Sequence, residues 1–242
     1  MHRILPILVF LTVLYYGQSN AAQSVPITAN SWLVADGSGK IIDGANTDQV
    51  RSIASISKLM TAMIVLDADQ DLDEYIKPYT RRELLQLSIV HSDNKATDVL
   101  CNRYPGGRTE CIRALNTKAR SLKLPNTRFI DPTGLSVFNV STAEELVQLV
   151  LESSKYPEIV VASKMTEVKI RLKKKWLIFR NTNPIIGKRH DFIVSKTGYI
   201  RASGGCIVMM LDTDVGRRVV VVLGSKNTHT RIPEAEFIAK KN

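Results

Sequence analysis

Serine and lysine side chains recur in three short motifs of this chain, at spacings that suit acyl transfer. In chain order the motifs are Ser55-Ile56-Ser57-Lys58, Ser92-Asp93-Asn94 and Lys196-Thr197-Gly198. A serine hydroxyl attacks a carbonyl carbon effectively only when a base accepts its proton, and a lysine is such a base once its amine is neutral. Each motif alone is short enough to arise by chance. The prediction of acyl-transfer chemistry therefore rests on all three together.

The first motif offers a nucleophile and a general base. Apolar residues recur at helical spacing from Ser57 to Ala68, which predicts a buried helix that starts at Ser55. Positions i and i+3 share one helix face, so Lys58 can reach the Ser55 hydroxyl and accept its proton. The backbone N–H of Ser55 can stabilise the oxyanion that forms. Without the other motifs, a helix cap and an exposed lysine would be the simpler interpretation.

The second motif offers a proton relay. Ser92 lies in a predicted turn before a helix that starts near Asp93, so its hydroxyl can pass a proton to the leaving amine. Asn94 can hydrogen-bond both the substrate backbone and Lys58. The alternative is an ordinary serine at a helix N-cap. His91 is a possible base by its chemistry, but a single histidine beside a helix cap is more often structural.

The third motif is predicted at the end of a strand, where it can bind substrate. Lys196 adds positive charge that lowers the pKa of Lys58, and the Thr197 hydroxyl can bind a substrate carboxylate. Gly198 leaves room for an acyl chain along the strand edge. The backbone N–H of Tyr199 is a candidate second oxyanion donor. The alternative is a strand that ends in a glycine turn.

The predicted elements that position these motifs indicate an α+β fold. Strand-like segments lie near both ends of the chain, and most of the middle third has helical spacing, with a capping box at Thr80 and Glu83. We expect an antiparallel sheet flanked by helices, with an inserted helical lobe. Residues 22–242 form one catalytic domain in this interpretation, with an α/β lobe at about 22–69 and 186–242 and a helical lobe at about 70–185.

The first residues predict export. A basic start is followed by 13 largely apolar residues, Ile4 to Tyr16, and by small residues that suit cleavage after about Ala21. Residues 1–21 therefore read as a signal peptide, which places the mature protein in the periplasm. The run is too short to span a membrane comfortably. The formal charge of +10 suits an anionic polymer or at most a peripheral membrane contact, although solubility alone would also explain it.

Cysteines and histidines give no metal-site pattern. The three cysteines and four histidines lack the spacings of zinc ligands, so no metal is expected. Cys101 and Cys111 flank a Tyr-Pro-Gly-Gly turn between two helical stretches and could pair in an oxidising compartment. The residues themselves leave that pairing open. Cys206 begins an apolar β segment and reads as a small buried side chain.

The three motifs and their surroundings resemble the low-molecular-mass penicillin-binding proteins, specifically D-alanyl-D-alanine endopeptidases of the penicillin-binding protein 7 type. The resemblance implies the fold shared with serine β-lactamases and transpeptidases, peptidoglycan stem peptides as substrate and β-lactams as covalent inhibitors. It implies no cofactor and no nucleic acid. Asp93 stands where glutamate is expected, and Ile200-Arg201 stand where small polar residues are expected. The resemblance covers nearly all of the mature chain, and it is carried besides the motifs by residues 52–63, 104–107, 131–136, 139–143, 179–183 and 206–209.

Three function classes compete: a D-Ala peptidase, a serine β-lactamase and a non-catalytic penicillin-binding protein. A β-lactamase is disfavoured because Ser55 and Ser92 are only 37 positions apart and no Glu-x-x-Leu-Asn segment lies between Ser92 and Lys196. A decayed binding protein should have lost the serine or the lysine, and both are present. Within the peptidase class, an endopeptidase would cleave D-alanyl-diaminopimelate cross-links, and a carboxypeptidase would release D-Ala. Arg201 would hold the adjacent carboxylate, or is simply an exposed loop arginine.

Overall fold

Segments from both ends of the chain build the main sheet of the protein. The computed structural model describes residues 25–188 and 191–241, so the predicted signal peptide lies outside the described residues. The sheet is antiparallel, with strand order β2-β1-β11-β10-β9. Its strands are β1 (Ser31–Asp36), β2 (Ile41–Ala45), β9 (Phe192–Ile200), β10 (Gly204–Thr213) and β11 (Gly216–Ser225).

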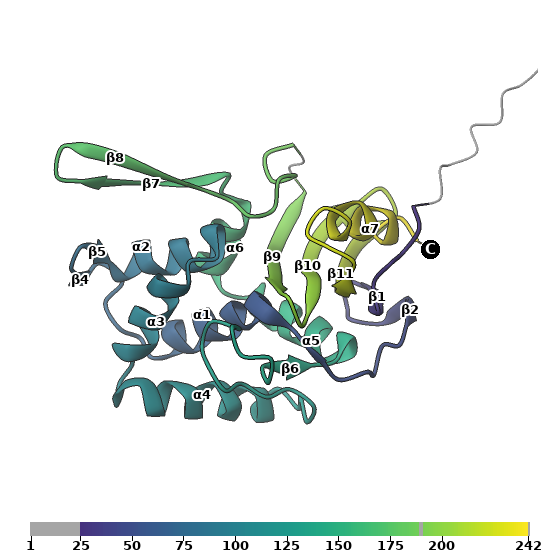
Figure 1. Cartoon of the computed structure of the whole chain (residues 1–242), viewed down its shortest axis with the longest axis horizontal. Coiled ribbons are helices and arrows are strands. Elements are labelled where there is room, and N and C mark those ends of the chain that lie inside the picture. The colour runs from purple at the N-terminus through teal and green to yellow at the C-terminus, as the bar shows by residue number, and fades with distance from the viewer. Residues whose placement is uncertain (1–24, 189–190, 242) are drawn as a thin grey trace, which may run out of the picture.

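The sheet is covered on both faces, which explains its long apolar strands. Successive residues of a strand point to opposite faces. In β11, Val219, Val221 and Leu223 join the larger core, whereas Val220 and Val222 join a second core. Helix α7 (Arg231–Ile238) closes the second core, and α5 (Ala143–Ser153) packs on the opposite side (Figure 1). An apolar run buried on both faces is the pattern expected for such a strand.

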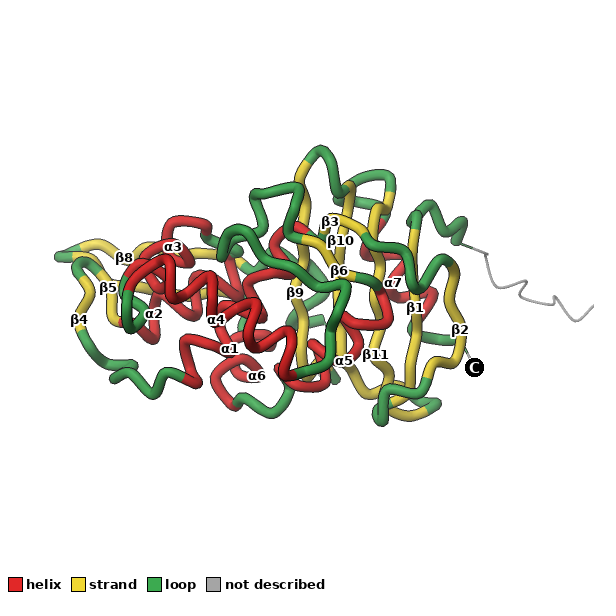
Figure 2. Tube along the Cα trace, turned by 90° about the horizontal axis from the view of Figure 1, so that it is seen from below, coloured by secondary structure: helices red, strands yellow, loops and turns green. Residues whose placement is uncertain are grey.

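Helix α1 (Ser57–Asp67) lies at the centre of the helical part. Its first nine residues, Ser57 to Val65, are all buried, which suits a helix that is apolar on every side. Helices α3 (Asn94–Asn102), α4 (Gly107–Ser121), α5 and α6 (Pro157–Lys164) contact it, and α2 (Arg81–Gln86) packs on α3. A π-helical turn, Leu87–His91, follows α2. In Figure 2, α1, α2, α3, α4 and α6 lie on the β9 side of the sheet, whereas α5 and α7 lie over the sheet itself, so β9 borders the helical part.

Short elements complete the helical part. Thr80 caps α2 in the predicted capping box with Glu83, and Thr142 caps α5. The two-residue strands are β3 (Arg51–Ser52), β4 (Tyr75–Ile76), β5 (Tyr79–Thr80) and β6 (Val140–Ser141). Within the described residues, no helix combines the length and apolar character needed to cross a membrane.

A hairpin interrupts the segment 70–185, which we predicted to be helical. Strands β7 (Glu167–Leu172) and β8 (Lys175–Arg180) pair in antiparallel register and project from the helical part (Figure 1). Val168 and Ile170 are buried while Lys169 and Arg171 are exposed, so the segment alternates with period two. That alternation in the sequence is typical of a strand, although the neighbouring segments are helical.

Cys101 and Cys111 form a disulfide that joins α3 to α4. A cross-link that closes a loop of this size stabilises a protein by about 2–3 kcal/mol, mainly by restricting the unfolded chain. We therefore expect Cys101→Ala/Cys111→Ala to lower the free energy of unfolding by about that amount, measured by urea denaturation. Reductant should destabilise the wild type and leave the double variant unchanged. Equal unfolding midpoints for the two proteins would contradict a stabilising cross-link.

Candidate active site

Ser55 and Lys58 meet where α1 begins. Ser55 lies in a 3-10 turn, Ala54–Ile56, directly before α1, rather than inside the predicted helix. Ala54 has a left-handed φ of 46°, which turns the chain sharply before the serine. Lys58 stands in the first turn of α1 and is fully buried, and its Nζ donates to Ser55 Oγ over 2.9 Å. Ser55 keeps part of its surface exposed and is therefore accessible to a substrate.

The Lys58 ammonium group donates to three oxygens at once. Besides Ser55 Oγ, its acceptors are Asn94 Oδ1 at 2.7 Å and the Thr133 carbonyl at 2.6 Å. Burial lowers the pKa of Lys58 to about 8, although nearby carboxylates, Asp131 foremost, act in the opposite direction. A neutral Lys58 is thus reachable near physiological pH. Once neutral, its lone pair can accept the Ser55 proton.

Ser92 and Lys196 form a second hydroxyl–amine pair. Ser92 has a left-handed φ of 59° between the π-helical turn and α3, whose N-cap is Asp93. The Nζ of Lys196 donates to Ser92 Oγ and to the Thr197 carbonyl, both at 2.9 Å. Because Lys58 also holds Asn94, two lysines hold the two polar side chains of the second motif.

Lys196 is a buried cation whose pKa lies well below that of a free lysine. Burial is the main cause, and the positive charges of Lys58 and Arg231 lower it further. The charge of Arg231 thus acts on the Lys196 amine. Positive charge at this position also stabilises negative charge that develops on a bound carbonyl oxygen.

Strand β9 passes directly beside Ser55. The prediction that Lys196-Thr197-Gly198 end a strand is wrong, because β9 continues to Ile200 and residues 198–200 pair with residues 204–206 of β10. A Cβ on Gly198 would lie 3.0 Å from both Ser55 N and the Ile53 carbonyl oxygen, so a side chain there would require the backbone beside Ser55 to shift. Thr197 is buried and donates its hydroxyl proton to Thr182 Oγ1 at 2.6 Å, while Tyr199 is half exposed.

Arg201 and Arg231 both follow the third motif in the chain, and Arg231 is the one of this pair that contacts it. Arg201 is exposed in the turn after β9 and lines a surface pocket with Thr28, Asn30 and Lys226. Arg231, at the start of α7, is buried and donates from Nη1 to the Gly198 carbonyl at 2.7 Å. Our sequence analysis missed Arg231 because it lies 33 positions away on another element. The carboxylate-binding role of Arg201 stays a prediction.

A loop at residues 131–136 was also missed as part of the site, although its Asp-Pro-Thr-Gly-Leu-Ser sequence contributes to the family resemblance. The carboxylate of Asp131 accepts hydrogen bonds from the backbone N–H groups of Thr133, Gly134 and Ser136. Thr61 Oγ1, on α1, donates to the Pro132 carbonyl. These bonds aim the Thr133 carbonyl at Lys58. The Asp-Pro-Thr-Gly sequence is a turn signal, so the presence of a loop here could be predicted from the sequence.

Gly134 fits the loop against the backbone that carries Ser55. Its φ is 83°, and a Cβ there would lie 1.9 Å from the Ala54 carbonyl oxygen and 2.8 Å from Ser55 N. We expect Gly134→Ala to lower the free energy of unfolding by about 2–4 kcal/mol and to slow acylation of Ser55 at least about tenfold. Thermal unfolding and stopped-flow labelling by a fluorescent penicillin measure the two effects.

Gly107 supplies the matched control for this substitution. Its φ is 76°, but nothing lies within 4 Å of the point that a Cβ would occupy, so Gly107→Ala adds backbone strain without a clash. It should cost about 1 kcal/mol and leave acylation unchanged. Equal behaviour of the two variants would show that the contact between Gly134 and Ala54 is unimportant.

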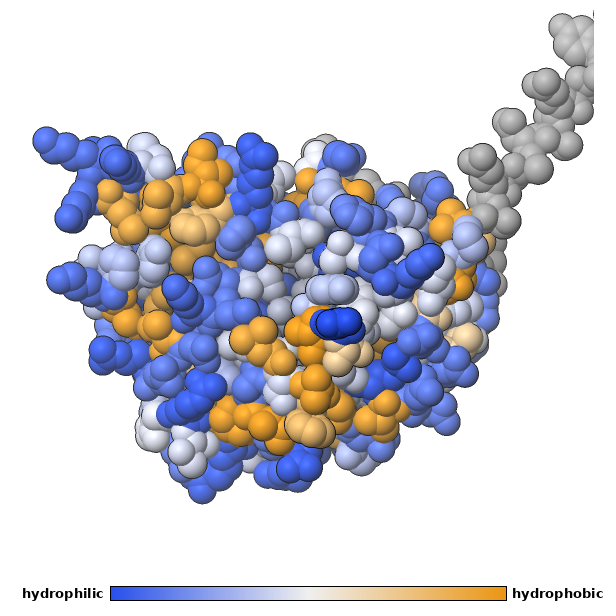
Figure 3. All heavy atoms as spheres, viewed as in Figure 1, coloured by the Kyte–Doolittle hydropathy of each residue, from blue (hydrophilic) through white to orange (hydrophobic). Residues whose placement is uncertain are grey.

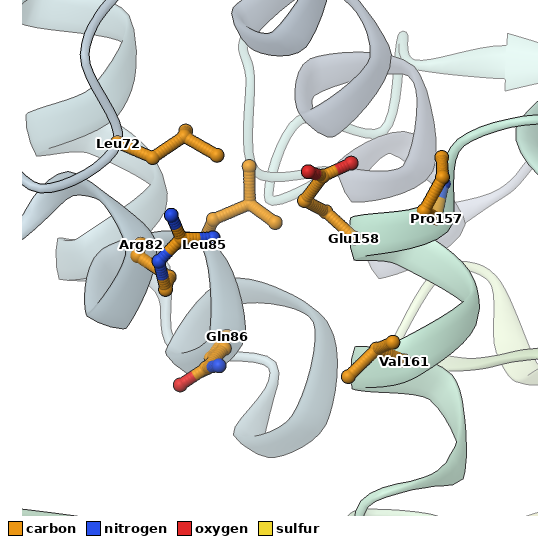
Figure 4. Close-up of a pocket in the computed structure, with 7 residues that line it drawn as sticks. All are labelled: Leu72, Arg82, Leu85, Gln86, Pro157, Glu158 and Val161. Carbon is orange, nitrogen blue, oxygen red and sulfur yellow. The ribbon is translucent and has the colours of Figure 1, made fainter.

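His91 has a structural position. Its Nδ1 lies 3.0 Å from the Arg180 carbonyl, and its ring meets the ring of Phe179 edge to face, with centroids 5.4 Å apart. These contacts tie the π-helical turn to the end of β8. A separate pocket of about 150 Å³ between α2 and α6 contains no motif residue (Figure 4). It is lined by Leu72, Arg82, Leu85, Gln86, Pro157, Glu158 and Val161.

The fold and the two serine–lysine pairs define a serine enzyme of the penicillin-binding class. The family model described as D-alanyl-D-alanine carboxypeptidase, peptidase family S11, matches residues 18–77 and 73–227. The chain belongs to this family of serine peptidases. The predicted resemblance and the enzyme class are thereby confirmed.

Similar proteins support the same assignment. A D-alanyl-D-alanine endopeptidase of Escherichia coli is 36% identical over 93% of this chain and 83% of its own. One from Pseudomonas aeruginosa is 36% identical over 86% of this chain and 75% of its own. Penicillin-binding protein D2 from Listeria monocytogenes, with ampicillin bound, superposes with a TM-score of 0.79 at 25% identity, over 89% of this chain and 97% of that one. The predicted α+β, transpeptidase-like fold is confirmed.

Proposed function

We propose that this protein is a periplasmic endopeptidase that hydrolyses D-alanyl-diaminopimelate cross-links of peptidoglycan through an acyl-enzyme on Ser55. The observation that carries the proposal is the hydrogen-bond arrangement of the three motifs. Lys58 Nζ donates to Ser55 Oγ and Asn94 Oδ1, and Lys196 Nζ donates to Ser92 Oγ. The endopeptidase names of the relatives at 36% identity favour this substrate. Export, with removal of residues 1–21, is part of the proposal.

Acylation begins with the neutral form of Lys58. Ser55 Oγ attacks the D-Ala carbonyl carbon as Lys58 takes its proton, and the oxyanion is stabilised by the backbone N–H groups of Ser55 and Tyr199. The C–N bond then breaks, and the leaving amine takes a proton from the Ser92 hydroxyl. Lys58 gives Ser92 the proton that it took from Ser55. Lys196 orients Ser92 by the hydrogen bond described above.

Substrate binding and deacylation use the same residues. Asn94 and the Thr197 hydroxyl bind the substrate backbone and carboxylate, Gly198 gives the acyl chain room beside β9, and Arg201 holds the carboxylate of the leaving amine. Water then attacks the ester carbonyl carbon and gives a proton to Lys58. The bond between this carbon and Ser55 Oγ breaks, Lys58 returns the proton to Ser55 Oγ, and the peptide leaves as a carboxylic acid. A β-lactam acylates Ser55 in the same way. Its opened ring remains attached as the acyl group.

The product profile of purified diaminopimelate-type muropeptides tests the proposal. Chromatography and mass spectrometry should show cross-linked dimers converted to monomeric tetrapeptides, with Ser55→Ala as the blank. Loss of only the terminal D-Ala from pentapeptides would instead show a carboxypeptidase that uses the same serine. The family description favours that second candidate. No turnover of either substrate, together with hydrolysis of free penicillin, would show a β-lactamase.

A further inference from the structure

The β7–β8 hairpin has an exposed outer face with a distinctive composition. Cross-strand partners share a face, and the register pairs Arg171 with Trp176 and Lys169 with Ile178. On the opposite face, Val168 and Ile170 are buried, whereas Leu177 of β8 is 36% exposed. Trp176 is 62% exposed and Ile178 is 55% exposed. In Figure 3, hydrophobic and hydrophilic spheres adjoin where the hairpin of Figure 1 projects.

This face is strongly basic. Lys169, Arg171 and Arg180 alternate along it, and Lys173-Lys174-Lys175 follow at the tip. Glu167 is the single acidic residue of the two strands and already pairs with Lys169 at 3.1 Å. Within the described residues, Arg171 and Arg180 form no ion pair, so they present uncompensated charge near the exposed Trp176. A surface of this kind is matched to an anionic partner that also has apolar faces.

The hairpin runs directly into the candidate active site. The Arg180 carbonyl lies 3.0 Å from His91 Nδ1, next to Ser92. Two residues later, the Thr182 N–H donates to the Val90 carbonyl and Thr182 Oγ1 accepts from Thr197. Trp176 lies six residues before Thr182, which is about 20 Å along an extended strand. The hairpin is thus joined to the residues beside Ser92 and Thr197, and its outer face lies at a distance from Ser55.

We propose that this outer face, formed by Lys169, Arg171, Trp176, Ile178 and Arg180, is a subsite for the peptidoglycan polymer beyond the cleaved peptide. Stem-peptide carboxylates pair with the cations, and a sugar ring lies against Trp176. The inference rests on the proposed peptidoglycan substrate. A membrane surface fits less well, because membrane binding grows with buried apolar area and only two large apolar side chains lie among the cations.

The test variant is Arg171→Glu/Trp176→Ala, and its matched control is Arg103→Glu/Val161→Ala. Both pairs reverse one exposed arginine and shorten one exposed apolar side chain, but the control residues lie on other elements. Binding to purified insoluble diaminopimelate-type peptidoglycan is measured by co-sedimentation in a Ser55→Ala background, which prevents digestion. Acylation by a fluorescent penicillin is measured with Ser55 present.

We expect the hairpin variant to bind insoluble peptidoglycan at least about fivefold more weakly than the control variant. Penicillin acylation and turnover of soluble muropeptides should stay within about twofold of wild type, because the subsite lies away from the reacting bond. A hairpin variant with normal peptidoglycan binding would overturn the inference. So would a variant that loses binding to anionic phospholipid vesicles alone, which would assign the hairpin to a membrane.

Failure of the proposed function has a different signature. In that case the wild type itself would neither cleave muropeptides nor form a penicillin adduct, whatever the hairpin variant binds. A hairpin variant with slow penicillin acylation would also overturn the subsite, because the hairpin would then support the active site itself.

Discussion

Ser55→Ala is expected to lose both muropeptide cleavage and covalent penicillin labelling. Removal of the attacking atom leaves nothing to form the acyl-enzyme, and nucleophile substitutions in serine hydrolases reduce turnover by at least about 10⁴-fold. Gel fluorescence after labelling and the muropeptide profile measure the two losses. Because Ser55 Oγ makes one described side-chain contact, with Lys58, thermal unfolding should change little.

Ser121→Ala is the matched control for this prediction. Ser121 is an exposed serine at the end of α4, so its hydroxyl can be removed far from the three motifs. This variant should keep full labelling and turnover. A Ser55→Ala protein that still carries a penicilloyl group would refute the assignment of the nucleophile, and peptide mapping would identify the serine that replaces it.

Lys58→Ala should slow acylation by about 10²–10⁴-fold, which is the usual contribution of a general base. Lys58→Arg provides the sharper comparison, because arginine keeps the positive charge and cannot lose its proton in a protein. Both variants should therefore be slow in stopped-flow penicillin acylation. A near-normal rate in Lys58→Arg would mean that the charge, rather than proton transfer, is what the site requires.

The pH dependence of the wild type belongs to the same prediction. Burial lowers the pKa of Lys58 to about 8, and the neutral form is the base. Acylation should therefore rise with pH, by about fivefold between pH 7 and 8, and level off above about pH 9. Lys58→Ala should lack this rise. A flat wild-type profile across this range would show that another group limits the rate.

Local patterns in the sequence predicted most of the scaffold. Helix α1 was predicted from the length and helical spacing of its apolar run, and the hairpin of β1 and β2 from two short apolar runs that flank the turn Asp36 to Gly39. The end of β9 could not be predicted from the sequence, because a strand continues as long as a neighbouring strand pairs with it. Gly198 ends no strand, since β10 still bonds to it. Pairing of this kind is a property of two distant segments.

The residues of the active site also differ in whether the sequence predicts them. Ser55 and Lys58 were found together because they are neighbours on one helical turn, and the residue order of the motifs marked Ser92 and Lys196. Arg231 and the Thr133 carbonyl were missed because tertiary packing alone brings them to the motifs. Main-chain oxygens carry no sequence signature at all. Such acceptors are recognised only once the loop conformation is known.

The Thr133 carbonyl has a consequence for how this protein can vary under antibiotic pressure. A main-chain oxygen holds Lys58, so no change of side chain at position 133 removes that hydrogen bond. The constraint falls instead on neighbouring Gly134, where any side chain meets the Ala54 carbonyl. Substitutions that reduce penicillin acylation while preserving the fold should therefore collect at exposed positions near Ser55 rather than in this loop. The loop that places the Thr133 carbonyl beside Lys58 should remain unchanged.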